Sequence, residues 1–184
     1  MKQLIYKNKI KKFINTKNLT YKIICTLLLS WVYALASQIY IPLPFQFIPI
    51  TLQTFILFSC PLIFGKMAFY ATITWILQGA LGLPMFFDGS GSLTHILGPT
   101  GGYLIGFLFS SYYLSTIKTK TSKNIILFLH MTIALFILHG SGILYLSFFI
   151  PLTLGLTLFF FIDLIKILII ILLAKLNLIK GKNN

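Results

Sequence analysis

The chain has 184 residues, of which 58% are hydrophobic and 9% are charged, and its formal net charge is +13. Soluble domains carry about 25% charged residues, so this composition excludes a water-soluble globule and indicates an integral membrane protein. At about 20 apolar residues for each membrane-spanning helix, the length allows roughly five or six helices and no separate soluble domain.

Four apolar runs predict the first four transmembrane helices, at 23–40, 50–64, 67–83 and 102–117. The prolines of Ile41-Pro42-Leu43-Pro44 end the first helix, because proline lacks an N–H group and disfavours helix at the residue before it. The first run could also be a secretory signal, since Ala34-Leu35-Ala36 is similar to a cleavage site. The chain stays equally hydrophobic beyond this point, which favours a retained helix.

The last apolar stretch, 125–174, is too long for one membrane crossing and long enough for two. A turn must lie within it, so the fifth helix is expected to end near Tyr145 and the sixth to begin between Phe149 and Ile162. The runs are continuous, whereas strands of a membrane barrel would alternate apolar and polar residues. The predicted fold is therefore all-α, with six transmembrane helices.

The basic residues are all lysines, and they lie between the apolar runs, with the exception of Lys166. The connections at 41–49, 84–101 and 140–160 contain no lysine. By the positive-inside rule, the lysine-bearing segments and both termini are cytoplasmic, as in a multi-pass protein of the inner (cytoplasmic) membrane. This placement indicates contact with a lipid bilayer and not with nucleic acid. The predicted organisation is a basic cytoplasmic segment (1–22), a six-helix membrane domain (23–175) and a basic cytoplasmic tail (176–184).

Asp163 and Lys166 are charged residues in the last apolar run, where each charge costs about 2.5–3.5 kcal/mol at the centre of a membrane helix. A spacing of three residues places them on one face of the helix, within reach of each other. They could form a structural salt bridge inside the membrane. They could instead line a polar cavity and bind a solute that has both donor and acceptor groups.

The segment 83–103 is the longest polar, glycine-rich stretch outside the basic ends, and it contains Asp88 and His95. A simple connection needs about two to eight residues, so its length favours a lid or binding loop. His95 alone is weak evidence for a site. His130 and His139 are expected to be helix or interface residues and not ligands, and no metal site is predicted.

Small residues recur on two predicted helices. Gly98, Gly102, Gly106 and Ser110 are four residues apart, which favours close packing of the fourth helix on a neighbour. Ser30, Ala34 and Ser37 form a similar face on the first helix, whose partner could lie in this chain or in another protein. Gln53 and Gln78, within the second and third runs, could bond a neighbouring helix or reach a shared cavity.

Several catalytic motifs are absent from the sequence. It has no phosphate-binding G-x-x-x-x-G-K-[ST] loop, no G-x-S-x-G elbow and no glutamate for an H-E-x-x-H zinc motif. The chain is therefore not expected to be an enzyme, to hydrolyse ATP or to hold a cofactor.

Five segments together resemble the BioY family, the biotin-specific S components of energy-coupling factor (ECF) transporters. They are SQIYIPLPF (37–45), PITLQT (49–54), QGALGLPMF (78–86), LGPTGGYLIGF (97–107) and DLIK (163–166). The resemblance covers about residues 20–175 and implies a six-helix subunit that captures substrate in the membrane. It also implies partners: a transmembrane coupling subunit and two cytoplasmic ATPases that drive translocation.

The resemblance suggests a set of site residues. Asp163 would accept from a ureido N–H of biotin, and Lys166 would donate to the ureido oxygen or the carboxylate. Gln53, Asp88 and Tyr103 would add polar contacts, while Trp75, Phe86 and Phe87 would cover the apolar ring and chain. Because the chain has no arginine, a lysine or the backbone N–H groups of the glycine loop must hold the carboxylate. Ser30, Ala34 and Ser37 are expected to dock the coupling subunit.

Two other functions remain open on the sequence. The chain could be a structural or assembly membrane protein without transport activity, in which Asp163 and Lys166 only fix the helix. It could also be an ion or proton carrier that uses Asp163.

Overall fold

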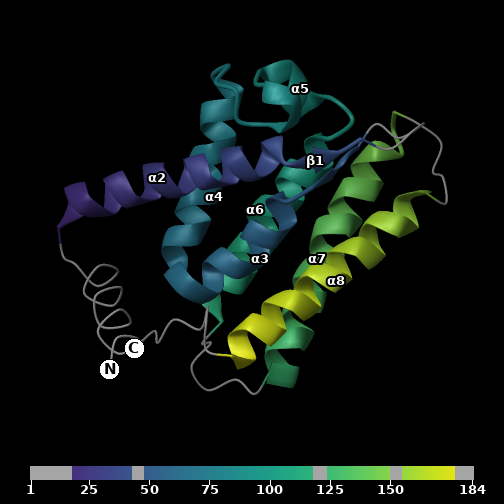
Figure 1. Cartoon of the computed structure of the whole chain (residues 1–184). Helices are drawn as coiled ribbons and strands as arrows, with labels where there is room; N and C mark the ends of the chain where they lie inside the picture. Colours follow the sequence, from purple (N-terminus) through teal and green to yellow (C-terminus); the bar gives the residue numbers. More distant parts are fainter. Residues whose placement is uncertain (1–17, 43–47, 118–123, 150–154, 177–184) are drawn as a thin grey trace.

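The computed structural model describes residues 18–42, 48–117, 124–149 and 155–176, and these form a bundle of helices (Figure 1). The long helices within these ranges are α2 (Leu19–Gln38), α3 (Gln53–Phe64), α4 (Lys66–Ala80), α6 (Gly101–Thr116), α7 (Asn124–Leu146) and α8 (Gly155–Lys175). The expectation of six long helices is confirmed in this part of the chain. The fifth ends one residue after Tyr145, and the sixth begins inside the predicted interval.

Parts of several predictions lie outside the described residues. These are most of the basic segment 1–22, most of the tail 176–184, the lysine-rich connection at 118–123 and the second proline of the break after the first helix.

The connection between α2 and α3 differs from the prediction. Tyr40–Ile41 (β1) and Ile50–Thr51 (β2) form a two-stranded antiparallel sheet, in which Tyr40 is opposite Thr51. The expectations that the first helix continues to Tyr40 and that the second begins at Ile50 are therefore wrong. Prolines within and beside this connection disfavour helix, and the extended segments that result can pair with each other.

Glycines set two turns of the chain. α3 and α4 are joined through Gly65 alone, at φ 56°, a backbone angle that glycine adopts without the clash that a side chain would cause. The third helix was expected to reach Leu83 but ends at Ala80, and Gly82 follows at φ 92°. A residue in this left-handed region just after a helix is a common helix terminator.

Three residues of the predicted small-residue face, Gly102, Gly106 and Ser110, pack on α7, whereas Gly98 ends α5 and lies against its backbone. A Cβ atom on Gly106 would lie 2.8 Å from the Leu138 carbonyl oxygen, so only glycine permits this approach. One turn later, Ser110 Oγ donates to the Ala134 carbonyl oxygen at 2.7 Å. Close backbone approach of this kind is how small residues hold membrane helices together.

The small-residue face of α2 also packs inside the chain. Ser30, Ala34 and Ser37 are buried, with exposed fractions of 0%, 3% and 0%. Ser30 Oγ donates to Gln78 Oε1 on α4 at 2.8 Å, and Ser37 Oγ donates to the Met85 carbonyl oxygen at 3.0 Å. These residues were expected to dock a partner subunit; in the described structure the face that they form is covered by α4 and the segment that follows it.

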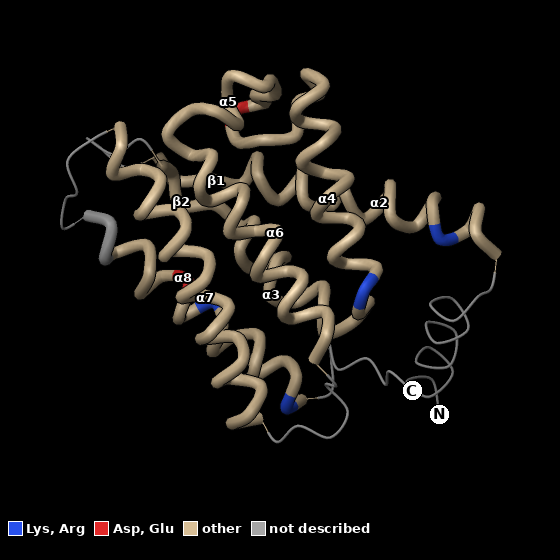
Figure 2. The backbone as a smooth tube through the Cα atoms, turned by 180° about the vertical axis from the view of Figure 1, so that it is seen from behind, with Lys and Arg blue, Asp and Glu red and all other residues tan. Residues whose placement is uncertain are grey.

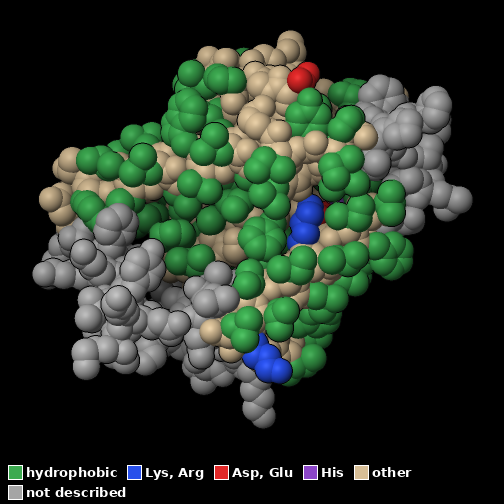
Figure 3. Space-filling model, viewed as in Figure 1, with side chains coloured by type: hydrophobic (Ala, Val, Ile, Leu, Met, Phe, Trp, Pro, Cys, Tyr) green, Lys and Arg blue, Asp and Glu red, His purple; other side chains and the backbone are tan. Residues whose placement is uncertain are grey.

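The surface and the charges suit a lipid environment. Two of the described helices, α2 and α7, are long and apolar enough to span a membrane, and α3 is a shorter apolar helix. Hydrophobic side chains dominate the face in Figure 3. Lys66 begins α4 and Lys175 ends α8, and Figure 2 places both helix ends on the side of the bundle away from α5 (Leu93–Leu97).

Candidate functional site

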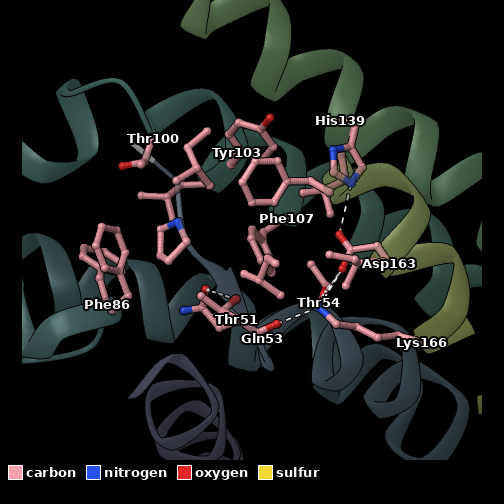
Figure 4. A pocket seen from close by; sticks show the side chains of 18 of the residues that line it. Thr51, Gln53, Thr54, Phe86, Thr100, Tyr103, Phe107, His139, Asp163 and Lys166 are labelled. Atoms are coloured by element: carbon pink, nitrogen blue, oxygen red, sulfur yellow. Dashed lines mark hydrogen bonds and ion pairs between the residues drawn. The ribbon is translucent and has the colours of Figure 1, made fainter. Parts of the chain in front are cut away.

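A partly open cavity lies among α3, α6, α7 and α8 and the loop that carries α5. Its wall is mainly aromatic and aliphatic, with a group of polar side chains on α3, α7 and α8 (Figure 4). Such a lining, apolar with a few convergent polar groups, is typical of small-molecule sites. The lining side chains are Ile48, Pro49, Ile50, Thr51, Gln53, Thr54, Phe86, Phe87, His95, Thr100, Tyr103, Leu104, Phe107, Leu138, His139, Phe159, Ile162, Asp163 and Lys166.

Asp163 is the centre of the polar group. Its Oδ1 accepts from Lys166 Nζ at 2.7 Å and from Thr54 Oγ1 at 2.6 Å, and its Oδ2 accepts from His139 Nε2 at 3.0 Å. The Asp163 side chain is 8% exposed and the His139 side chain is 5% exposed. A buried carboxylate needs such donors, because unpaired it would carry a large desolvation cost. Asp163 and Lys166 thus form a salt bridge, and both also line a cavity.

Lys166 also connects α8 to the start of α3. Its Nζ donates to the Thr51 carbonyl oxygen and to Thr54 Oγ1, both at 2.7 Å, in addition to Asp163. An ammonium group has three N–H donors, so these partners use all of them. A ligand that bonds to Lys166 must therefore replace one of the chain's own acceptors.

Two aromatic wall residues lie directly over glycines. A Cβ on Gly142 of α7 would lie 2.5 Å from Tyr103 ring atoms, and a Cβ on Gly79 of α4 would collide with the Phe86 ring. The Phe86 ring also stacks on His95, with ring centroids 4.8 Å apart and an interplanar angle of 16°. The shape of the aromatic wall thus depends on the absence of side chains at these two helix positions.

The loop before α5 is tied to the end of α2. Gln38 Nε2 donates to the Phe86 carbonyl oxygen at 2.8 Å, and Gln38 Oε1 accepts from the Gly89 N–H at 2.9 Å. Gly89 ends the 3-10 turn η1 (Phe87–Gly89). Through these bonds, the position of the Phe86 and Phe87 wall depends on α2.

Two residues predicted to touch substrate lie elsewhere. Asp88, in η1, is exposed, does not line the cavity and accepts from Tyr40 Oη at 3.2 Å; this bond raises the pKa of the Tyr40 phenol. Trp75 is fully buried behind the wall, where its Nε1 donates to the Met85 carbonyl oxygen at 2.7 Å and its ring meets Phe86 edge-on. Both shape the loop instead of facing the cavity.

The other predicted site residues, Asp163, Lys166, Gln53, Tyr103, Phe86 and Phe87, all line the cavity. Sequence reasoning missed Thr54 and set His139 aside as a helix or interface residue. The available signal was a histidine inside an apolar run of α7. The role of His139 in the polar group depends on its contact with Asp163, which is 24 residues away in the sequence. No local sequence pattern indicates this contact.

Comparisons with known proteins agree with this architecture. Residues 7–180 match the BioY family. A protein of Thermotoga maritima named biotin transporter BioY is 31% identical over 143 residues, which cover 73% of this chain and 83% of that protein. A Rickettsia prowazekii protein named probable biotin transporter BioY is 29% identical over 145 residues, covering 78% of this chain and 71% of that protein.

A solved structure has the same fold. The crystal structure of the S-component for biotin from an ECF-type ABC transporter matches with a TM-score of 0.71 and 21% identity, over 87% of this chain and 94% of that one.

The fold and the cavity define an all-helical membrane protein of a transporter class and not an enzyme. The chain belongs to the BioY family.

Proposed function

We propose that this chain is a biotin-capturing S component, which binds biotin in the cavity between α3, α6, α7 and α8. The observation that carries the proposal is the lining itself: a polar group centred on Asp163 beside an aromatic wall, in a chain of the BioY family. Biotin has the matching parts, a ureido ring with donors and an acceptor, an apolar thioether ring and a carboxylate-bearing chain.

Six of the lining residues have a role in this proposal. Asp163 accepts from a ureido N–H in addition to its present donors, because a carboxylate can accept about four hydrogen bonds. Lys166 donates to the ureido oxygen or the carboxylate in exchange for one of its present acceptors. Gln53 and Tyr103 add polar contacts, since both line the cavity and the Tyr103 hydroxyl has no hydrogen-bond partner within the described structure. Phe86 and Phe87 cover the apolar ring.

The proposal extends to energy, partners and location. Translocation is driven by two cytoplasmic ATPases through a transmembrane coupling subunit, because the sequence has no phosphate-binding loop of its own. The membrane unit spans 23–175 in the cytoplasmic membrane, with both termini in the cytoplasm. The lysine-free connection 84–101, which carries α5, then lies on the outer side.

Direct binding tests the proposal. The purified full-length chain in lipid nanodiscs should bind radiolabelled biotin saturably, and unlabelled biotin should compete while lipoate, which lacks the ureido group, should not. Lys175→Ala, at the exposed end of α8, is the matched control for changes at Lys166. Absence of saturable biotin binding by the folded chain would contradict the proposal and favour a purely structural role. Uptake that follows a pH gradient without ATPase partners would favour an ion-coupled carrier.

A further inference from the structure

His139 contacts the polar centre of the cavity through only one of its ring nitrogens. Nε2 lies 3.0 Å from Asp163 Oδ2, and the side chain is 5% exposed. Nδ1 is buried and has no hydrogen-bond partner within the described ranges. An ionised carboxylate only accepts, so Nε2 carries a hydrogen atom. Nδ1 is then an acceptor in the neutral ring and a second donor in the imidazolium.

When an anion enters the cavity, the lining side chains leave its negative charge unbalanced. Among the lining residues, the acidic one is Asp163 and the lysine is Lys166, and their charges cancel at a separation of 2.7 Å. The chain has no arginine. If the proposed function holds, the substrate adds a carboxylate to this low-dielectric space, where an unbalanced charge is costly. One more positive charge would restore neutrality.

The other titratable lining groups do not supply this charge. The two ring nitrogens of His95 contact hydroxyl groups, of Ser90 at 3.2 Å and of Thr100 at 3.3 Å, and burial lowers the pKa of His95. Tyr103, from α6, meets the His139 ring edge-on at a centroid distance of 5.9 Å, and a phenol has no cationic form. α3 contributes Gln53 and Thr54, which do not titrate.

We propose that His139 carries the balancing proton, so that its imidazolium compensates the carboxylate of the bound substrate while Asp163 and Lys166 compensate each other. The second N–H of the imidazolium then finds an acceptor in the substrate. This inference rests on the proposed function and adds a specificity element to it: the cavity distinguishes an acid from its uncharged ester.

The test compares biotin with biotin methyl ester on the full-length chain in nanodiscs, from about pH 6 to about pH 9, a range around the ordinary titration of histidine. The Kd of biotin should rise with pH by up to about tenfold per unit, the limit for linkage to one proton. The Kd of the ester should stay constant. The wild-type comparison decides the question without any variant. A constant Kd for biotin, or equal slopes for acid and ester, would overturn the inference.

Variants then test whether the pH dependence of biotin binding comes from His139. His139→Gln keeps an N–H for Asp163 but cannot be charged, so biotin binding should weaken and lose its pH slope, while ester binding should persist. His130→Gln, on the same helix and bonded to Tyr113 at 2.8 Å outside the cavity, is the matched control and should keep the slope. His95→Gln should also keep it. Loss of the slope in either control, or its survival in His139→Gln, would contradict the assignment.

These outcomes separate the two proposals. A folded chain that binds neither biotin nor its ester at any pH fails the proposed function itself. Saturable binding of biotin with a constant Kd leaves the proposed function standing and overturns only the role of His139.

Discussion

Asp163 shows how a charge can be kept inside a membrane bundle. Donors from three helices converge on its two oxygens: Thr54 from α3, His139 from α7 and Lys166 from α8. Each partner removes part of the desolvation cost that would otherwise exclude the carboxylate from the bundle. The same contacts hold α8 against its neighbours, so the residues proposed to bind biotin also stabilise the fold.

Replacing Lys166 by alanine should weaken biotin binding by about 30-fold to several thousand-fold, because removal of one partner of a buried charge pair costs about 2–5 kcal/mol. Equilibrium binding of labelled biotin measures the effect. Lys166 also bonds α3, so the melting temperature of the detergent-purified chain must be measured alongside. Unchanged affinity in a folded Lys166→Ala protein would exclude Lys166 from the site, and Lys175→Ala should match wild type.

The glycine beneath Tyr103 allows a second residue-level prediction. In Gly142→Ala, the methyl group requires the space of the Tyr103 ring, so the aromatic wall must shift. Overpacking costs about 1–3 kcal/mol, which corresponds to roughly 5-fold to 150-fold if the loss appears in biotin affinity. Gly140→Ala, two residues away with open space around its Cβ position, should bind normally. Equal affinities of the two variants, measured by equilibrium binding, would show that the ring position does not matter.

Among the elements, α2 differs most from its expected role. Its small residues lie against α4 and the following segment, and Gln38 at its end holds the loop beside Phe86. The face that remains outward carries large apolar residues such as Leu28 and Leu35, which suits contact with lipid. A partner subunit that meets α2 must do so through this outward face.

Ala34→Trp should therefore destabilise the isolated chain, since a large side chain cannot fit where Ala34 is 3% exposed. A cost of about 1–3 kcal/mol is expected from overpacking, visible as a lower melting temperature without any partner present. Leu35→Trp is the matched control, because the adjacent Leu35 is 65% exposed and its replacement should be tolerated. Equal melting temperatures would mean that the α2–α4 contact is not tight.

Sequence patterns predicted the helices well and the site in part, for a physical reason. Helix positions follow from apolar length and from prolines, which are local signals, and charged residues in an apolar run mark a polar site wherever it lies. The contact between His139 and Asp163 depends on how α7 and α8 pack. Likewise, nothing local to Trp75 tells whether it faces the cavity or the opposite side of Phe86.

At the scale of the whole molecule, the loop with α5 and the helix ends at Lys66 and Lys175 lie on opposite sides of the bundle (Figure 2). In the proposed orientation the loop faces outward, and it forms one wall of the cavity through Phe87 and His95. Substrate that arrives from the outside then meets this loop beside the cavity.

Ser90→Cys should label with an impermeant thiol reagent added outside intact cells, and more slowly when biotin is present. Ser90 contacts His95 at 3.2 Å, so closure of the loop on biotin would shield it. Lys66→Cys, at the other end of α4, should label only after the cytoplasmic side is made accessible. Labelling of Ser90→Cys only from the cytoplasm would reverse the topology, and equal rates with and without biotin would remove the gating role of the loop.

The three acceptors already bonded to Lys166 also bear on the heat capacity change of biotin binding, which calorimetry measures. Each hydrogen bond that biotin makes to Lys166 replaces one that the chain makes to itself, so the net polar gain at Lys166 is small. A large share of the free energy is then expected from dehydration of apolar surface against residues such as Phe86 and Phe107. Titrations over a range of temperatures should therefore give a clearly negative heat capacity change. A value near zero would mean that polar contacts, and not the aromatic wall, supply the affinity.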